Sequence, residues 1–426
     1  MADPSIQVGA DSQLATTVFE MLGKVPPLPK ECCIFKVPEC LRSVNEEAFT
    51  PIVISIGPLH HEEKKLQPFE AHKKRYLSSF LQRNSNISLE DCVKLLRGCE
   101  ERARNFYFED QFSWCYSSDE FVRMMLLDGC FIIEFFLEEE NEYDPVKKSH
   151  SLWNSVARDI LLLENQLPYF VLNNLYNLVN GPEKRCSRVS FHQITLHRLN
   201  YLLIMGQPDH FIRSSCDDIK HLLDILRVFF VPSTTRILTK ETAKVRRIPS
   251  ATTLHESGVK FNMGTTNCFL DITFTKGVIN IPTMIVEDRT ELVFRNLIAM
   301  EQSQEDTTTF IGDYFYILDS LVNTANDVAF LQSNGIIENY LGSNEEVAQM
   351  INNIENGVVA RIDRNYYGAL MQDLNDYYSR PWHQWKAKLR RDYFNNPWTI
   401  ISLCAAFFLL VCTLIQTVCL VISVRR

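Results

Sequence analysis

Residues 398–424 read WTIISLCAAFFLLVCTLIQTVCLVISV, a run without a charged side chain that Arg425 and Arg426 follow. As a helix this run would be about 40 Å long at about 1.5 Å per residue, which exceeds the roughly 30 Å hydrocarbon core of a bilayer. A buried helix of a water-soluble domain seldom stays apolar on every side over such a length. The sequence therefore predicts one transmembrane helix over 398–424 and a separate body before it.

The segment 381–397, which precedes this run, is predicted as a basic, aromatic juxtamembrane segment. Amphipathic rings and long cationic side chains settle at the headgroup level of a bilayer. The residues assigned to this membrane interface are Trp382, Trp385, Lys386, Lys388, Arg390, Arg391 and Trp398.

Small and hydrogen-bonding side chains share one face of the predicted membrane helix. Such a face lets two helices approach and pair in lipid, although scatter on a monomeric anchor is the alternative. Self-association therefore stays a hypothesis. The residues of this helix-pairing face are Ser402, Ala406, Thr413 and Gln416.

Several features predict the placement of the body. The cations between 386 and 391 outnumber the two terminal arginines, which favours a cytosolic body by the positive-inside rule. The N-terminus has no basic region of the kind that begins a secretory signal. The cysteines of the body form no CxxC pair, which is typical of buried thiols in a reducing compartment. We expect a single-pass protein with a C-terminal anchor in the plasma membrane or an endomembrane; sugar on Asn86, which lies in an Asn-Ile-Ser sequon, would contradict this topology.

The composition of the whole chain indicates a folded body before residue 398. The chain has 426 residues, of which 46% are hydrophobic and 22% charged, so most of it can bury a core. Its formal net charge of −9 argues against nucleic acid as a partner, because phosphate contacts need an excess of Lys and Arg.

The pattern along the chain predicts a mainly α fold with a small β-sheet, an α+β class. Residues 1–33 are predicted as a flexible lead-in and 34–380 as a helical body, with short strands around 248–286 and a hairpin at Gly277. A capping box begins with Ser88. The helices are expected over 68–82, 88–109, 119–142, 151–178 with Pro168 kinking or dividing it, 217–231, 291–302, 314–332, 344–356 and 364–388.

Two places could carry chemistry. His60, His61 and the acids after them could bind zinc or move protons, but adjacent residues diverge by about 100° on a helix, and a polar loop after Gly57-Pro58 is favoured. Asp128 lies among apolar residues and needs partners or a raised pKa, and a hydrogen-bonded structural acid is favoured over a catalytic one. Glu134, on a polar stripe of the same helix, is expected to face water. We predict no catalytic residue, cofactor or metal site.

Five stretches resemble a known plant family, the one named domain of unknown function 247. They are 34–77 (IFKVPECLRSVNEEAFTPIVISIGPLHHEEKKLQPFEAHKKRYL), 125–136 (MLLDGCFIIEFF), 159–176 (DILLLENQLPYFVLNNLY), 248–302 (with IPSATTLHESGVKF and IPTMIVEDRTELVFRNLIAMEQ) and 313–347 (DYFYILDSLVNTANDVAFLQSNGIIENYLGSNEEV). The resemblance implies a plant membrane protein with a helical body, a C-terminal anchor and no established enzymatic activity. Some grass members are implicated in self-incompatibility, a recognition role. This sequence departs from the family pattern at Leu59 and Glu62.

We therefore expect a membrane protein that serves protein recognition, signalling or scaffolding, with the lipid bilayer and an unknown protein as its partners. The alternative is a membrane-tethered hydrolase or metal-dependent enzyme that uses Asp128 or His60 and His61.

Overall fold

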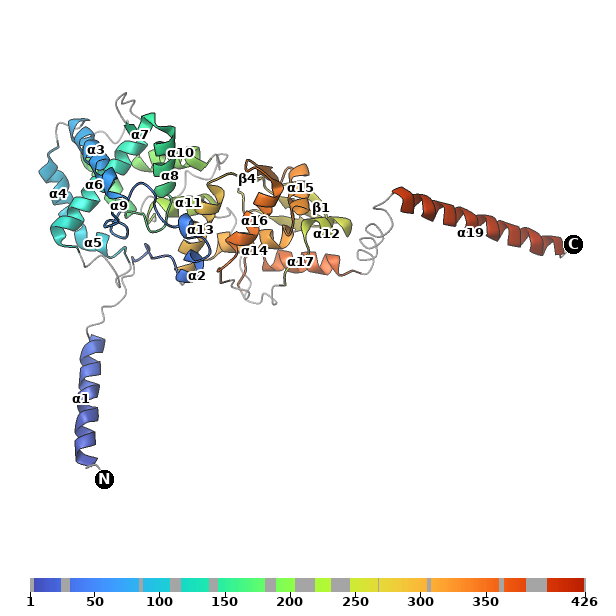
Figure 1. Cartoon of the computed structure of the whole chain (residues 1–426), viewed down its shortest axis with the longest axis horizontal. Helices are drawn as coiled ribbons and strands as arrows, with labels where there is room; N and C mark the ends of the chain where they lie inside the picture. Colours follow the sequence, from blue (N-terminus) through green and yellow to red (C-terminus); the bar gives the residue numbers. More distant parts are fainter. Residues whose placement is uncertain are drawn as a thin grey trace.

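The described residues are mainly helical, as the sequence predicts, and form two small sheets where one was predicted (Figure 1). The structure, a computed structural model, describes residues 4–23, 31–83, 87–107, 116–137, 145–180, 189–203, 219–230, 246–266, 268–304, 308–359, 364–380 and 397–424.

The N-terminal half is helical and is built around α6 (Ser118–Phe136). This helix is buried on nearly every side, because its sequence is apolar almost all round, and α3, α4 and α9 pack against it. The predicted capping box at Ser88 is confirmed, and a second one at Ser117 starts α6. The other elements are α1 (Pro4–Gly23), α2 (Glu39–Arg42), η1 (Glu46–Ala48), η2 (Gln67–Phe69), α3 (Glu70–Arg83), α4 (Leu89–Gly98), α5 (Glu100–Arg104), α7 (Pro145–Lys148), α8 (His150–Asp159), α9 (Tyr169–Asn180), α10 (Phe191–Leu203) and α11 (Leu222–Phe230).

The C-terminal half contains both sheets. In the first, the strand order is β1-β3-β2, with β1 and β3 parallel and β2 and β3 antiparallel. In the second, β4 and β5 are parallel. The elements are α12 (Ala251–Glu256), β1 (Lys260–Met263), β2 (Thr273–Thr275), β3 (Val278–Ile281), β4 (Met284–Val286), α13 (Thr290–Gln302), α14 (Phe310–Leu321), α15 (Ala325–Ser333), β5 (Ile337–Asn339), α16 (Asn344–Ile354), α17 (Gly368–Tyr378) and α19 (Pro397–Val424).

The hairpin predicted at Gly277 is confirmed. Gly277 joins β2 to β3 with a φ of +82°, which a residue with a side chain rarely adopts. A Cβ at this position would lie 2.7 Å from the hydroxyl of Tyr377 on α17, so glycine also allows α17 to pack on the hairpin.

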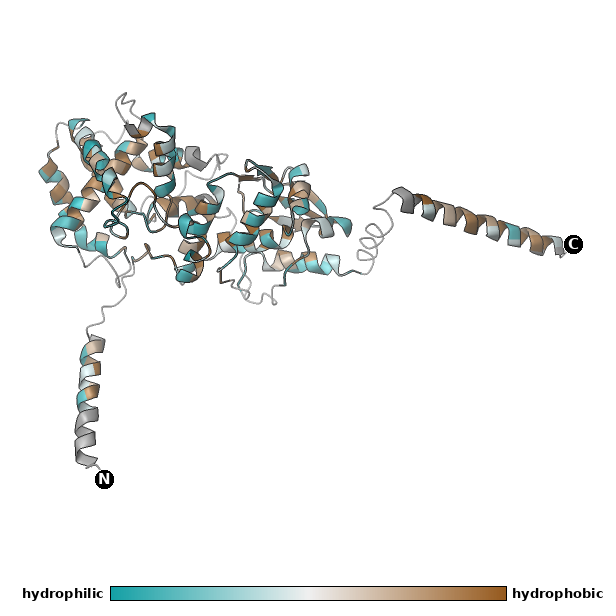
Figure 2. Cartoon of the chain, in the orientation of Figure 1, coloured by the Kyte–Doolittle hydropathy of each residue, from teal (hydrophilic) through white to brown (hydrophobic). Residues whose placement is uncertain are grey.

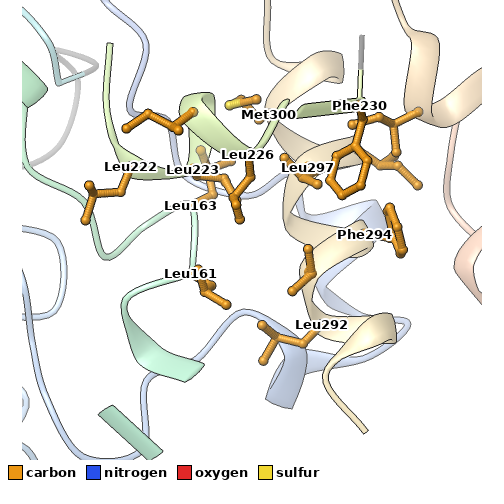
Figure 3. Close-up of a cluster of buried hydrophobic side chains, with 14 of the residues drawn as sticks. Leu161, Leu163, Leu222, Leu223, Leu226, Phe230, Leu292, Phe294, Leu297 and Met300 are labelled. Atoms are coloured by element: carbon orange, nitrogen blue, oxygen red, sulfur yellow. The ribbon is translucent and has the colours of Figure 1, made fainter. Parts of the chain in front are cut away.

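One hydrophobic cluster joins the two halves (Figure 3). Leu161 and Leu163 precede α9, Leu223 and Leu226 lie on α11, and Leu297 lies on α13; all five are fully or almost fully buried. Because these residues come from both halves, the body has one continuous core.

Some predicted helices end earlier or are divided. The helix expected over 119–142 ends at Phe136. The stretch 151–178 is divided into α8 and α9, with the irregular segment 160–168 between them, and the stretch 314–332 is divided into α14 and α15. A capping box of Thr324 and Asp327 starts α15, which explains the second division. The helix expected over 364–388 is α17 as far as Tyr378, and 381–396 lie outside the described residues.

The two ends of the chain hold helices that Figure 1 draws apart from the body. Helix α1 lies within the segment predicted as a flexible lead-in. Helix α19 is apolar along most of its length, as Figure 2 shows. Of the helices in the described ranges, however, none is both long and apolar enough to cross a membrane. This finding does not support the membrane-spanning part of the predicted fold class.

Candidate functional site

A buried polar site is formed by Asp159, Glu164, Asn165 and Gln166, which lie around the irregular segment 160–168. All four side chains are at least 96% buried although each is polar. A buried polar group is costly unless it is hydrogen-bonded, so each of them must find partners inside the protein. We call these four residues the polar hub.

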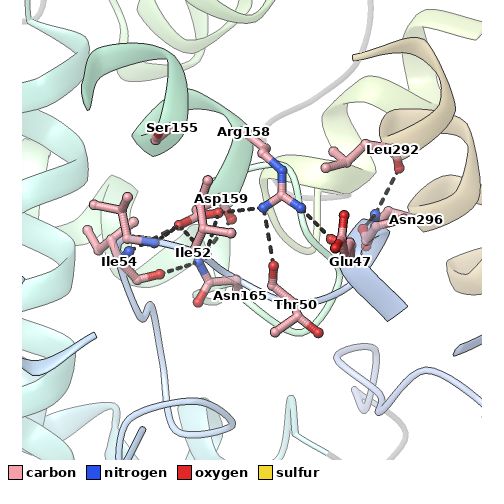
Figure 4. A network of polar contacts seen from close by, with 12 residues as sticks. Glu47, Thr50, Ile52, Ile54, Ser155, Arg158, Asp159, Asn165, Leu292 and Asn296 are labelled. Atoms are coloured by element: carbon pink, nitrogen blue, oxygen red, sulfur yellow. Dashed lines mark hydrogen bonds and ion pairs between the residues drawn. The ribbon is translucent and has the colours of Figure 1, made fainter. Parts of the chain in front are cut away.

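Asp159 binds the backbone of the segment that runs from 52 to 54. Its carboxylate accepts hydrogen bonds from the N–H groups of Ile52, Val53 and Ile54 at 2.7–3.1 Å. Arg158 donates to the same carboxylate at 2.9 Å and to the carbonyls of Thr50 and Glu47 (Figure 4). The irregular segment 52–54, which pairs with no strand, is thereby held by side chains.

Asn165 and Gln166 continue this pattern. Asn165 accepts from Ile56 N at 2.6 Å and donates to the carbonyls of Ile54 and Asp159. Gln166 donates to the carbonyls of Ile160 and Leu162 and accepts from the N–H of Leu223 on α11. These bonds satisfy backbone groups that a helix would have used, so 160–168 stays irregular.

Glu164 contacts a backbone N–H group and two basic side chains that precede it in the sequence. It accepts from Val37 N at 2.6 Å, lies 2.6 Å from Arg42 and lies 3.0 Å from Nε2 of His60. Burial alone would raise the pKa of Glu164, but His60, Arg42 and the Val37 amide together lower it. Glu164 is therefore an ionised structural carboxylate.

His60 is bound at both ring nitrogens. Its Nδ1 contacts the carboxylate of Glu63 and its Nε2 that of Glu164. The two nitrogens point in opposite directions, so these carboxylates and the ring do not converge on one ion. His61 packs edge-on against Tyr116 with 5.8 Å between ring centroids, away from this bridge. In the part of the chain that is described, no group of three or more His, Cys, Asp or Glu side chains is placed to hold a metal ion.

Asp128 is a fully buried acid with partners, as expected for a structural role. One carboxylate oxygen lies 2.6 Å from Nζ of Lys73, and the other accepts from Gly57 N at 2.9 Å. Lys73 also lies 2.6 Å from Glu70. Burial alone would lower the pKa of Lys73, but these two carboxylates raise it, so the ammonium stays charged.

The expectation that Glu134 faces water is wrong. Glu134 is buried and forms an ion pair with Arg83. A helical wheel assumes that the polar side of a helix is exposed, whereas α3 covers this side of α6.

The sequence did not single out Cys33 or His221, which the structure buries completely. Burial raises the pKa of the Cys33 thiol and lowers the pKa of His221 to about 4. A neutral thiol and a neutral imidazole differ from the thiolate and imidazolium of a reactive cysteine site.

A polar groove of about 630 Å³ lies between α8 and the turn that precedes α13. It contains side chains of both charges, and Nη1 of Arg289 is buried without a hydrogen-bond partner among the described residues. No pattern in the sequence brings these residues together, because they come from both halves. The lining residues are Asn154, Ser155, Arg158, Glu287, Asp288, Arg289 and Tyr340.

Most of the residues predicted at the membrane interface lie outside the described part of the chain. Trp382, Trp385, Lys386, Lys388, Arg390 and Arg391 lie outside the described residues, and Trp398 lies in the first turn of α19. The side chains of the predicted pairing face are exposed on α19, and the face stays a prediction; they are Ser402, Ala406, Thr413 and Gln416.

Comparison with known proteins confirms the resemblance. The chain matches the model of domain of unknown function 247, described as a plant protein of unknown function, over residues 34–412, and it belongs to this family. It is 31% identical to the UPF0481 protein At3g47200 of Arabidopsis thaliana, in an alignment that covers 98% of this chain and 90% of the relative. It is 22% identical to the putative UPF0481 protein At3g02645 of the same plant, over 92% of this chain and 90% of that relative. No solved structure matches the chain.

Proposed function

We propose that this protein is a single-pass membrane protein, anchored by α19, whose body serves protein recognition or scaffolding on the cytosolic side. The observation that carries the proposal is the surface of α19. Phe407, Phe408, Leu409 and Leu410 are consecutive and each is 67–72% exposed, so apolar side chains surround one full turn of the helix. Each large apolar side chain kept in water costs about 1.5–3 kcal/mol relative to burial. A lipid environment removes this cost.

The sequence also supports an anchor, because 398–424 contain no charged side chain and as a helix would extend about 40 Å at about 1.5 Å per residue, more than the roughly 30 Å of a hydrocarbon core. The cations at 386–391 and the tryptophans beside them would then lie at headgroup level.

A recognition role is supported by how the body uses its polar groups. The polar hub, Asp128 and His60 are bound to backbone groups or to opposite charges, which is what a rigid scaffold requires. The groove of about 630 Å³ beside Arg289 is the surface that we propose for the partner. Its mixture of charges suits a segment of a polar polypeptide better than a uniformly charged ligand.

Site-specific photo-crosslinking in native membranes tests this role. A photoreactive residue at Asn154, inside the groove, should give a discrete crosslinked product, whereas the same residue at Glu345, which is exposed on α16, should not. Identical products at both positions, or none at Asn154, would contradict recognition through the groove.

Topology has a separate test. Protease added to intact membranes should digest the body, and glycosidase should leave its mass unchanged. A protected body or sugar on Asn86 would place the body on the other side of the membrane.

A further inference from the structure

A small cavity lies where α13, α14 and the end of α16 meet. Its volume of about 10 Å³ is close to that needed for one water molecule. Three carboxylates line it, from Glu301, Asp313 and Glu355, and none of the described residues around it is a cation. Asp319, one helical turn and a half beyond Asp313 on α14, acts on the Glu355 carboxyl through its charge. We call these four acids the acidic cage.

Glu301 is the innermost member of the acidic cage. Its side chain is completely buried and accepts from the N–H groups of Ile311 and Gly312, at the start of α14, at 3.1–3.3 Å. Arg227 of α11 lies 3.6 Å away, and Asp313 of α14 opposes it. Burial, partly offset by Arg227, raises the pKa of Glu301 to about 7.

Asp313 holds the chain that leads to α17. Its carboxylate accepts from the side-chain amide of Asn365 at 3.1 Å, from Tyr366 N at 2.6 Å and from the hydroxyl of Thr309 at 3.3 Å. Asp319 has a cation of its own, Arg247, at 2.6 Å. Both aspartates are thus supplied with donors.

Glu355, the residue that ends α16, is placed less favourably. It faces Asp319 and Asp313 of α14, with Arg247 as the opposing cation. Burial is the largest influence and raises the pKa of Glu355 to about 7. A carboxylate charge here would add to the negative charges of Asp319 and Asp313.

We propose that the acidic cage is a proton-controlled latch that holds residues 355–359 and 364–366 against α13 and α14. With Glu301 and Glu355 protonated, the remaining charges of the cage have partners and the latch is closed. When both glutamates lose their protons to solvent, repulsion loosens the end of α16 and the chain that enters α17, the last described body helix before 381–396 and α19.

Proton linkage determines the direction in which pH changes the stability of the latch. The two glutamates hold protons in the folded chain up to about pH 7 but in the unfolded chain only to about 4.5. Their stabilising effect is complete below pH 4.5 and is lost as pH rises through 7. The latch therefore opens toward alkaline pH.

Hydrogen exchange of the full chain in phosphatidylcholine nanodiscs tests the latch. Amide protection is measured at pH 5.5 and pH 8.0, and each rate is divided by the intrinsic rate at that pH. Since one unit of pKa difference corresponds to a tenfold change in equilibrium, protection over 355–359 and 364–368 should fall by about tenfold or more, while α6 keeps its protection.

Variants test whether the acidic cage causes the loss of amide protection at pH 8.0. The double variant Glu301→Gln/Glu355→Gln, which keeps the size of both side chains and removes both titrations, should retain protection at pH 8.0 within about twofold of pH 5.5. Each single variant should lose less protection than the wild type. Glu345→Gln, an exposed acid at the other end of α16, should behave as the wild type. Retained protection in the double variant supports the latch. Equal wild-type protection at both pH values, or a wild-type loss in the double variant, overturns it.

Discussion

At the scale of residues, the body uses carboxylates and amides where other folds use a sheet. Asp159 accepts from three consecutive N–H groups, and Asn165 binds the carbonyl of Ile54 and the N–H of Ile56 in the same irregular segment. Each of these side chains is buried, so removing one leaves amides without partners and without water. Residues 159–166 belong to one of the five stretches that resemble the family. In this chain their buried polar side chains have a structural role.

Asp159→Asn is expected to lower the free energy of unfolding by about 2–3 kcal/mol. The substitution exchanges one acceptor oxygen for an amide nitrogen that faces N–H donors. Urea denaturation measures the change, with Asp373→Asn, an exposed acid on α17, as the matched control. A loss no larger than that of the control would show that the hydrogen bonds from Ile52, Val53 and Ile54 to Asp159 are not needed for stability.

Lys73→Met is expected to lower the free energy of unfolding by about 3–5 kcal/mol, because Asp128 is left as an uncompensated buried charge. Adding Asp128→Asn should recover part of the loss, since the neutral amide can still accept from Gly57 N. Equal losses in the single and double variants, measured by urea denaturation, would mean that packing rather than charge sets the cost.

The sequence indicated the character of Asp128 but not its partner. An acid among apolar residues must be compensated, yet nothing along the chain marks Lys73, which precedes it by 55 residues, as the cation. The groove at Arg289 and the acidic cage are invisible in the sequence for the same reason. Their members lie on elements that only tertiary packing brings together.

At the scale of elements, patterns that act locally were predicted well. The capping box at Ser88 and the hairpin at Gly277 each depend on a few neighbouring residues, and both are confirmed. Apolar periodicity alone did not reveal that α14 and α15 are separate, because both helices continue the apolar pattern. Pro168 correctly predicted that 151–178 is divided, but not that the irregular segment begins at 160; Asn165 and Gln166, which bind the carbonyls of Asp159 and Ile160, account for that part.

The cluster in Figure 3 should make the two halves unfold together. Leu297→Ala on α13 removes a fully buried side chain and should cost about 2–5 kcal/mol. Fluorescence and far-UV circular dichroism should report one shared transition at lower urea. Leu89→Ala, at a 47% exposed position, is the control. Two separated transitions in the wild type would contradict a single core.

At the scale of the whole molecule, an acidic body precedes an uncharged helix. Those two parts have opposite requirements for solvent: the body carries almost all the charge of the chain, and α19 carries none. Figure 2 shows this contrast along the chain. The groove and the latch lie in the body, and the chain between α17 and α19 connects them to the proposed anchor.

Extraction of membranes with alkaline carbonate tests the anchor most directly. The full chain should stay in the membrane pellet. A variant with Leu410→Arg and Leu414→Arg, which adds about 2.5–3.5 kcal/mol of insertion cost per arginine, should move to the supernatant, and Leu14→Arg on α1 should stay in the pellet. Recovery of the wild-type chain in the supernatant would contradict a membrane anchor at α19.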